Sequence, residues 1–154
     1  MELIEGVSVK ALKRISDYRG FLMEIMRPDW PEFRKFGQVY MTACKPNVAK
    51  GWHYHKRQTD SFCVVKGTAR IVLYDMRKDS KTFGKINEFV VSAEDPKLVQ
   101  IPAFVCHGFC AEGKEEAFIV NVPSETYNYK EPDEHRFPFD SPEIPYKWNV
   151  ERGG

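Results

Sequence analysis

The sequence has no apolar run approaching the roughly 18 residues that a helix needs to cross a bilayer. Its first fifteen residues lack the basic start and apolar core of a secretory signal. It also lacks an excess of either charge, because 23 Lys and Arg against 22 Asp and Glu give a net charge of +1. This balance excludes the basic stripe of a nucleic-acid-binding protein. We therefore expect no nucleic-acid partner, no membrane partner and a cytoplasmic location.

Cysteine is scarce, and its four residues form no CxxC pair and no regular disulfide framework. The chain also lacks internal repeats and low-complexity segments. Helix-period patterns are scarce, and only the segment 29–36 is expected to make a turn or two of helix, after Pro31. We expect the thiols, including Cys106 and Cys110, to be reduced, buried and inert.

Short runs of β-branched and aromatic residues, separated by Gly, Pro and charged turns, dominate the 154 residues. The pattern predicts one all-β domain, 1–154, and Lys66–Gly67 is expected to form a hairpin turn. The expected strands are 7–15, 20–27, 36–45, 51–56, 61–67, 69–76, 87–92, 98–103, 107–112 and 117–122.

The composition changes at about Glu131. Residues 131–148, EPDEHRFPFDSPEIPYKW, hold four of the ten prolines and five acidic residues. Proline donates no ladder hydrogen bond, so residues 131–154 are expected to form an extended C-terminal arm rather than a central strand. Its aromatic residues are expected to pack back onto the barrel.

Three of the four histidines fall in two short motifs. In GWHYHKRQTDSFCVVKG, His53 and His55 are two residues apart, a spacing that places both rings on one face of a strand. Asp60 follows after a short connection. In IPAFVCHGF, His107 comes five residues after Pro102. We expect the four polar side chains to converge on one site.

The two motifs resemble the two cupin signatures, with Asp60 where cupins usually have Glu. This resemblance implies a jelly-roll barrel in which His53, His55, Asp60 and His107 bind one divalent metal ion. Imidazoles and a carboxylate suit Fe, Mn, Ni, Co or Zn, and Gln58 can replace Asp60 as the fourth contact. The alternatives, four ordinary histidine and carboxylate positions or a site without metal, stay open.

A wider resemblance extends from residue 17 to residue 148. The order and spacing of DYRGFLME, YDMRKDSKTFG, IPAFVCHGF and FDSPEIPYKW are similar to those of the dTDP-4-dehydrorhamnose 3,5-epimerase family. The family consists of cupin jelly rolls that are usually homodimers. The resemblance implies a small-molecule substrate, a nucleotide sugar, and a reaction next to the carbonyl of a 4-keto sugar.

The family pattern also implies how the substrate is bound. Arg19, Glu24 and Gln38 would contact the nucleotide, some of them across a dimer interface. Lys50 stands where the family has Arg. It would keep the positive charge but could not form the two parallel hydrogen bonds of a guanidinium group. Without the resemblance, a surface ion pair is the better explanation of Arg19 and Glu24.

For catalysis, the resemblance implies that His53 is the general base and that Asp140 is the carboxylate orienting it. Asp140 is also a plausible turn former, since Ser141–Pro142 follows it. His107 would line the sugar pocket. Tyr127 and Tyr129 are candidate proton donors.

Several positions depart from the family. His55 stands where the family has Gln, Tyr40 where it has Asn, and Val120 where it has the Tyr that returns the proton. Asp60 stands where the family has a Lys that stabilises the enolate, and a carboxylate there would repel that anion. A divalent metal ion at His55 and Asp60 would replace the lost charge as a Lewis acid. If His53 ligated that metal, it would not be free to act as the base.

Three interpretations therefore remain. The first is a divergent sugar-nucleotide epimerase or isomerase. The second is a metal-dependent cupin of other chemistry, such as an oxygenase or isomerase. The third is a catalytically inactive cupin that binds a sugar or nucleotide.

Overall fold

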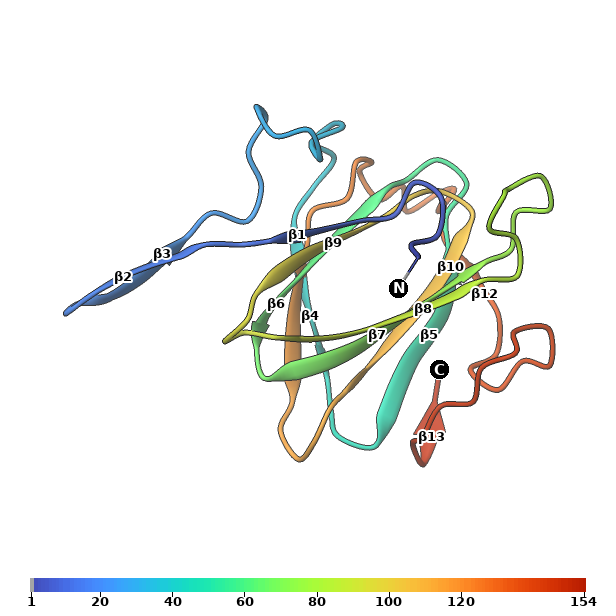
Figure 1. The fold of residues 1–154 in the computed structure, drawn as a ribbon. Coiled ribbons are helices and arrows are strands. Elements are labelled where there is room, and N and C mark those ends of the chain that lie inside the picture. The colour runs from blue at the N-terminus through green and yellow to red at the C-terminus, as the bar shows by residue number, and fades with distance from the viewer. Residues whose placement is uncertain (1) are drawn as a thin grey trace.

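A computed structural model describes residues 2–154, which form an all-β jelly roll of two facing antiparallel sheets (Figure 1). The first sheet has the order β1 (Ser8–Ala11), β9 (Lys97–Ile101), β6 (Asp60–Lys66), β11 (Ala117–Asn121) and β4 (Tyr40–Cys44). The second has the order β12 (His135–Arg136), β5 (Val48–Tyr54), β10 (Val105–Ala111), β7 (Thr68–Asp75) and β8 (Ile86–Ser92). The short strand β13 (Arg152–Gly153) pairs in parallel with β5. The all-β cupin prediction is confirmed.

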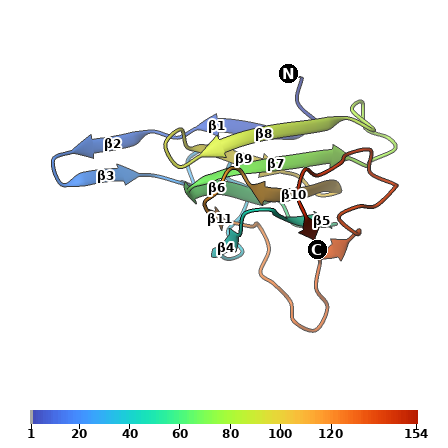
Figure 2. The ribbon, with the colours of Figure 1, turned by 90° about the horizontal axis from the view of Figure 1, so that it is seen from below.

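A separate hairpin, β2 (Arg14–Asp17) and β3 (Gly20–Met23), projects away from the barrel (Figures 1 and 2). The expected strand 7–15 is therefore divided. Its first part pairs with β9, and its second part leaves the sheet.

Two local predictions were wrong. Lys66–Gly67 does not close a hairpin, because β6 and β7 belong to opposite sheets and the turn carries the chain from one to the other. Gly67 has a φ of +68°, and a Cβ there would lie 2.5 Å from the carbonyl oxygen of Glu116. Residues 29–36 form turns instead of a helix, with the Phe33 amide donating to the Trp30 carbonyl.

The apolar core fills part of the space between the two sheets. It includes fully buried residues from both of them, among them Val64, Ile71, Leu73 and Ile119. The ring of Phe62 packs edge to face against Phe109 and also against His107. The apolar interior therefore ends directly beside a polar cavity.

Residues 131–154 contain only the two short strands β12 and β13 and pack against the outer face of the second sheet (Figure 2). Trp52, which is completely buried, lies at the centre of this contact. Its ring packs against Tyr146 and Trp148, and its Nε1 donates to the carbonyl of Phe139. Trp52 thus faces outward and sends His53, the next residue, into the barrel.

Within the described residues, no helix is long and apolar enough to span a membrane. The cytoplasmic location stays a prediction.

Candidate active site

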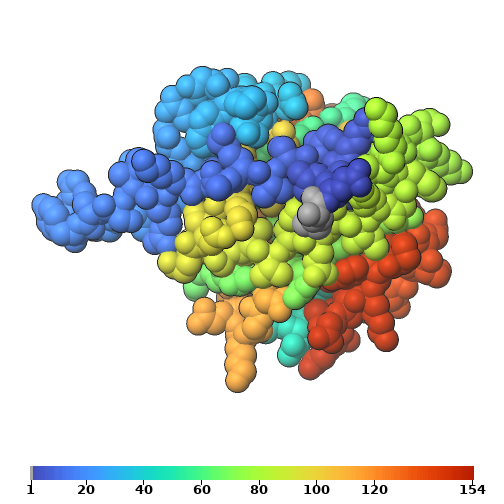
Figure 3. Space-filling view, viewed as in Figure 1, coloured from blue at the N-terminus to red at the C-terminus, as the bar shows by residue number. Residues whose placement is uncertain are grey.

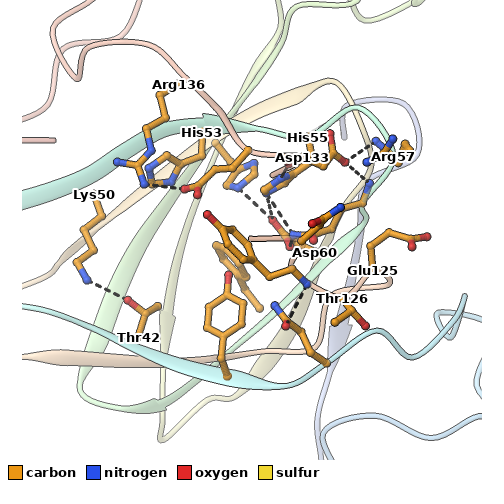
Figure 4. Close-up of a pocket in the computed structure, with 18 of the residues that line it drawn as sticks. Thr42, Lys50, His53, His55, Arg57, Asp60, Glu125, Thr126, Asp133 and Arg136 are labelled. Atoms are coloured by element: carbon orange, nitrogen blue, oxygen red, sulfur yellow. Dashed lines mark hydrogen bonds and ion pairs between the residues drawn. The ribbon is translucent and has the colours of Figure 1, made fainter. Parts of the chain in front are cut away.

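A cavity of about 590 Å³ opens between the two sheets (Figure 4). Its size lies within the range of small-molecule sites. Its walls come from β4, β5, β6 and β10 and from the segment 125–136 that leads to β12. The lining is mostly polar or charged and includes His53, His55, Asp60, His107, Gln38, Lys50 and Tyr127.

His53 projects into this cavity from β5. It lies directly opposite His107 of β10 in the strand register, with ring centroids 6.3 Å apart. Burial, together with the neighbouring His107, lowers the pKa of His53 to about 4. The imidazole is therefore neutral at physiological pH and free to accept a proton.

His55, Asp60 and His107 form a compact buried trio. The Asp60 Oδ2 lies 3.1 Å from the His55 Nε2 and 3.2 Å from the His107 Nε2. The other ring nitrogens point away, since the Nδ1 of His107 contacts the Val105 carbonyl and the Nδ1 of His55 contacts the Asp133 carbonyl. Each ring therefore presents its Nδ1 to a backbone carbonyl and its Nε2 to the carboxylate.

The second oxygen of Asp60 is fully engaged. Oδ1 accepts hydrogen bonds from the side-chain amides of Gln58, at 2.7 Å, and Asn121, at 2.8 Å. Burial alone would raise the pKa of Asp60, but the two imidazoles outweigh it and hold the pKa well below its usual range. Burial would likewise lower the pKa of His55, yet Asp60 raises it. The trio is therefore a place where positive charge is stabilised.

The structure brings three of the four proposed metal ligands together. The ligand atoms of His55, Asp60 and His107 all lie within 4.8 Å of one another, and His53 is not part of that group. His53 shares the cavity but stays free for another role. A metal ion held by His55, Asp60 and His107 would therefore not prevent His53 from acting as the base.

Two of the predicted nucleotide contacts also line the cavity. The Nζ of Lys50 donates to the Thr42 hydroxyl at 3.0 Å, which links β5 to β4 across the cavity. Gln38 accepts a hydrogen bond from the backbone amide of Tyr127 at 3.2 Å. The cavity that holds the trio is therefore also lined by the ammonium group of Lys50 and the side-chain amide of Gln38.

Three predicted residues lie outside the cavity. Arg19 is exposed on the β2–β3 hairpin and pairs with Asp17, and Glu24 pairs with Arg27 just after that hairpin. Asp140 is exposed and does not line the cavity, so it is not placed to orient His53. That assignment is corrected: the segment containing Asp140 packs on the outer face of the sheet, opposite to the histidine.

The sequence analysis missed several charged residues that do line the cavity. Asp133 accepts hydrogen bonds from the backbone amides of residues 56, 57 and 58 and so holds the turn after β5 that positions His55. Arg136 pairs in register with His53 and donates to Glu134 at 2.8 Å. Their only sequence signal was the charged run 133–136, because the pairing of β12 with β5 joins segments about 80 residues apart.

Val120, the position at which we expected the family's proton-returning Tyr to be missing, does not face inward. Val120 lies opposite Met41, which is 60% exposed, whereas Asn121 lies opposite Tyr40 and reaches Asp60. The inward-facing residue of β11 at this depth is Asn121.

Comparison with known proteins agrees with this geometry. The family model described as polysaccharide biosynthesis C-terminal domain matches residues 15–135. The spore coat polysaccharide biosynthesis protein SpsL of Bacillus subtilis is 39% identical over 97% of this chain and 99% of its own. The probable low-salt glycan biosynthesis epimerase Agl13 of Haloferax volcanii is 38% identical over the full length of both. The dTDP-4-dehydrorhamnose 3,5-epimerase of Shigella flexneri is 32% identical over 75% of this chain and 68% of its own.

The chain belongs to the dTDP-4-dehydrorhamnose 3,5-epimerase-like family. A crystal structure of a dTDP sugar isomerase from Desulfovibrio desulfuricans superposes with a TM-score of 0.89. The two are 31% identical over 94% of this chain and 92% of that one. The predicted family is thus confirmed.

Proposed function

We propose that this protein is a sugar-nucleotide epimerase or isomerase that acts next to the carbonyl of a 4-keto sugar. One observation carries the proposal: His53 is a neutral imidazole that faces a polar cavity beside a centre of positive charge. The named activities of Agl13 and of the dTDP sugar isomerase support the same chemistry. An oxygenase or an inactive binding module has no comparable support.

In the proposed reaction, His53 removes the proton from the carbon next to the carbonyl. The C–H electron pair moves to the carbonyl oxygen and gives an enolate. The C–H bond next to a ketone becomes acidic enough only if positive charge or hydrogen-bond donors stabilise the developing negative charge on that oxygen. The trio, together with Lys50 and Arg136, offers positive charge on the cavity walls for this oxygen and for the diphosphate.

The test is direct. A dTDP-linked 4-keto-6-deoxyhexose is incubated with the protein in heavy water and followed by proton NMR. We expect loss of the sugar C–H signal next to the carbonyl and appearance of an isomeric product. Binding of dTDP without any C–H exchange would favour the inactive module instead.

The trio also fits a divalent metal ion, and we propose one such site. The separations of 3.1 and 3.2 Å between the Asp60 oxygen and the two Nε2 atoms are slightly shorter than the ligand-to-ligand edges of about 3.3–3.4 Å in a tetrahedron with bonds of about 2.0–2.1 Å. The Nδ1 contacts to carbonyls are the usual outer partners of metal-binding histidines. The Asp60 Oδ2 is buried and has no hydrogen bond of good geometry. A bound ion would supply Lewis-acid charge at the position where the family has Lys.

We expect about one divalent ion per chain after reconstitution, measured by elemental analysis, and a rise in melting temperature with Zn²⁺, Mn²⁺, Fe²⁺, Ni²⁺ or Co²⁺. Asp60→Asn keeps the side-chain shape but removes the charge, and it should weaken metal binding by more than about 100-fold, beyond the cost of losing an outer partner. Asp140→Asn, a surface change, is the matched control. A wild-type protein without metal that turns over fully after chelation would show that the trio carries protons instead.

We further propose a homodimer that involves the β2–β3 hairpin. Ile15, Phe21 and Leu22 on the hairpin are more than half exposed. Met41 on the edge strand β4 and Val39 just before that strand are also more than half exposed. Figure 3 shows the hairpin standing clear of the rest of the chain. A second copy would cover these apolar surfaces and pair the free edge of β4.

In such a dimer, the hairpin would carry Arg19 to the nucleotide site of the partner. Arg19→Ala should then raise KM about 10-fold with little change in kcat, since the lost contact is to a part of the substrate that does not react. Lys81→Ala, on the exposed β7–β8 loop, is the control. Analytical ultracentrifugation should give twice the chain mass for the wild type. A monomeric mass, or an unchanged KM for Arg19→Ala, would contradict this arrangement.

A further inference from the structure

Tyr40 places a phenol in the cavity wall, on the sheet opposite the one that carries His53. The residue alternates with the outward Met41 on β4 and shares its inward face with Thr42. Figure 4 shows Thr42 on the side of the cavity opposite His53. Tyr40 is 41% exposed as a residue and lines the cavity, so a ligand entering the cavity can reach it.

The hydroxyl of Tyr40 is held in place by the network around Asp60. It accepts a hydrogen bond from the Asn121 Nδ2 at 2.9 Å, and the same amide donates to Asp60. Among the described residues, no acceptor is in contact with the hydroxyl proton of Tyr40. A phenol that accepts one hydrogen bond and has its own O–H free can donate that proton to a ligand.

Burial and the negative charge of Asp60 raise the pKa of Tyr40 to about 12. The phenol is therefore protonated throughout the physiological range, as a proton donor must be.

His53 and Tyr40 stand on different sheets. His53 belongs to β5 of the second sheet, and Tyr40 belongs to β4 of the first. Inversion at a carbon needs a proton removed from one face and a proton returned to the other. A sugar ring held between the sheets would present one face to each residue.

We propose that Tyr40 is the general acid that reprotonates the enolate from the face opposite His53. This inference rests on the proposed function and names its second catalytic residue. The phenol O–H breaks, a new C–H bond forms at the carbon that His53 deprotonated, and the enolate electron pair forms that bond while the carbonyl is restored. The phenolate then regains a proton from solvent as the His53 imidazolium loses its own.

Tyr127 is the competing donor. It lines the same cavity, but it lies on the segment between β11 and β12, where its ring packs edge to face on the exposed Tyr129. No hydrogen bond fixes its hydroxyl among the described residues. Tyr127→Phe therefore tests the competing donor, and Tyr74→Phe, on β7 in the outer-face cluster, is the matched control for Tyr40→Phe.

The experiment compares two rates in heavy water, exchange of the sugar C–H next to the carbonyl and formation of the inverted product. In Tyr40→Phe, we expect product formation to fall about 100-fold, while exchange, which needs only His53, falls by less than about 10-fold. Tyr74→Phe should change both rates by less than about threefold, because Tyr74 does not line the cavity. Thermal melting checks that each variant is folded.

A Tyr40→Phe protein with normal product formation, or with both rates lowered equally, would overturn the inference. So would a selective loss of inversion in Tyr127→Phe. If the wild type itself shows neither exchange nor product, the proposed function fails, and that outcome is distinct from a failure of Tyr40 alone.

Discussion

Replacing His53 by Asn is expected to lower kcat/KM by about 10² to 10⁴, and to lower the rate of sugar C–H exchange with it. Asparagine has similar size and polarity but cannot take up a proton at neutral pH. His53 faces the cavity, and its pKa, lowered to about 4 by burial and by His107, leaves the ring unprotonated in the resting protein. Both rates are measured by proton NMR in heavy water.

The fourth histidine supplies the control. His135 stacks on Tyr54 with ring centroids 4.9 Å apart and does not line the cavity. His135→Asn should therefore leave kcat/KM within about threefold of the wild type. If His53→Asn retained wild-type exchange, another group would have to be the base.

Replacing Trp52 by Ala is expected to reduce the free energy of unfolding by about 3–5 kcal/mol, measured by urea denaturation at 25 °C. The Trp52 side chain is fully buried between the second sheet and residues 131–154, so its loss would leave a cavity under Tyr146 and Trp148. The Nε1 hydrogen bond to Phe139 would also be lost.

Phe83→Ala is the matched control, because Phe83 is 53% exposed and its removal should cost under about 0.5 kcal/mol. In Trp52→Ala we also expect faster proteolysis within residues 131–154, since Trp52 anchors this segment to the barrel. A loss of less than about 1 kcal/mol would show that the aromatic cluster contributes little to stability.

The anchoring of this segment bears on catalysis as well as on stability. It contains Asp133, which holds the turn beside His55, and Arg136, which pairs with His53. A protein that loses the outer contact should therefore lose activity before it unfolds completely.

The sequence resemblance implies a Lys where this chain has Asp60, and the contacts of Asp60 bear on that difference. A lone carboxylate would repel an enolate, but Asp60 is paired with two imidazoles through one oxygen and with two amides through the other. Positive charge at the trio, whether carried by protons or by a metal ion, offsets the carboxylate.

The sequence by itself determined the fold class and most of the site. Alternation along β5 placed His53 and His55 on the inner face and Trp52 on the outer face, because strand side chains alternate whatever the sheet packs against. The spacing of Pro102 and His107 matched a family motif, so the third histidine was assigned correctly to the same cavity.

Only the tertiary structure decided which of these residues touch. Strand register decides that His55, and not His53, contacts Asp60, and that Asn121, and not Val120, faces inward. Sheet order decides that Lys66–Gly67 does not close a hairpin. Asp133 and Arg136 reach the site through pairing with a strand about 80 residues away, and Asp140 is carried to the outer face by the same segment. Local patterns specify the face of a strand, but long-range pairing specifies the partner, since it depends on the packing of the whole barrel.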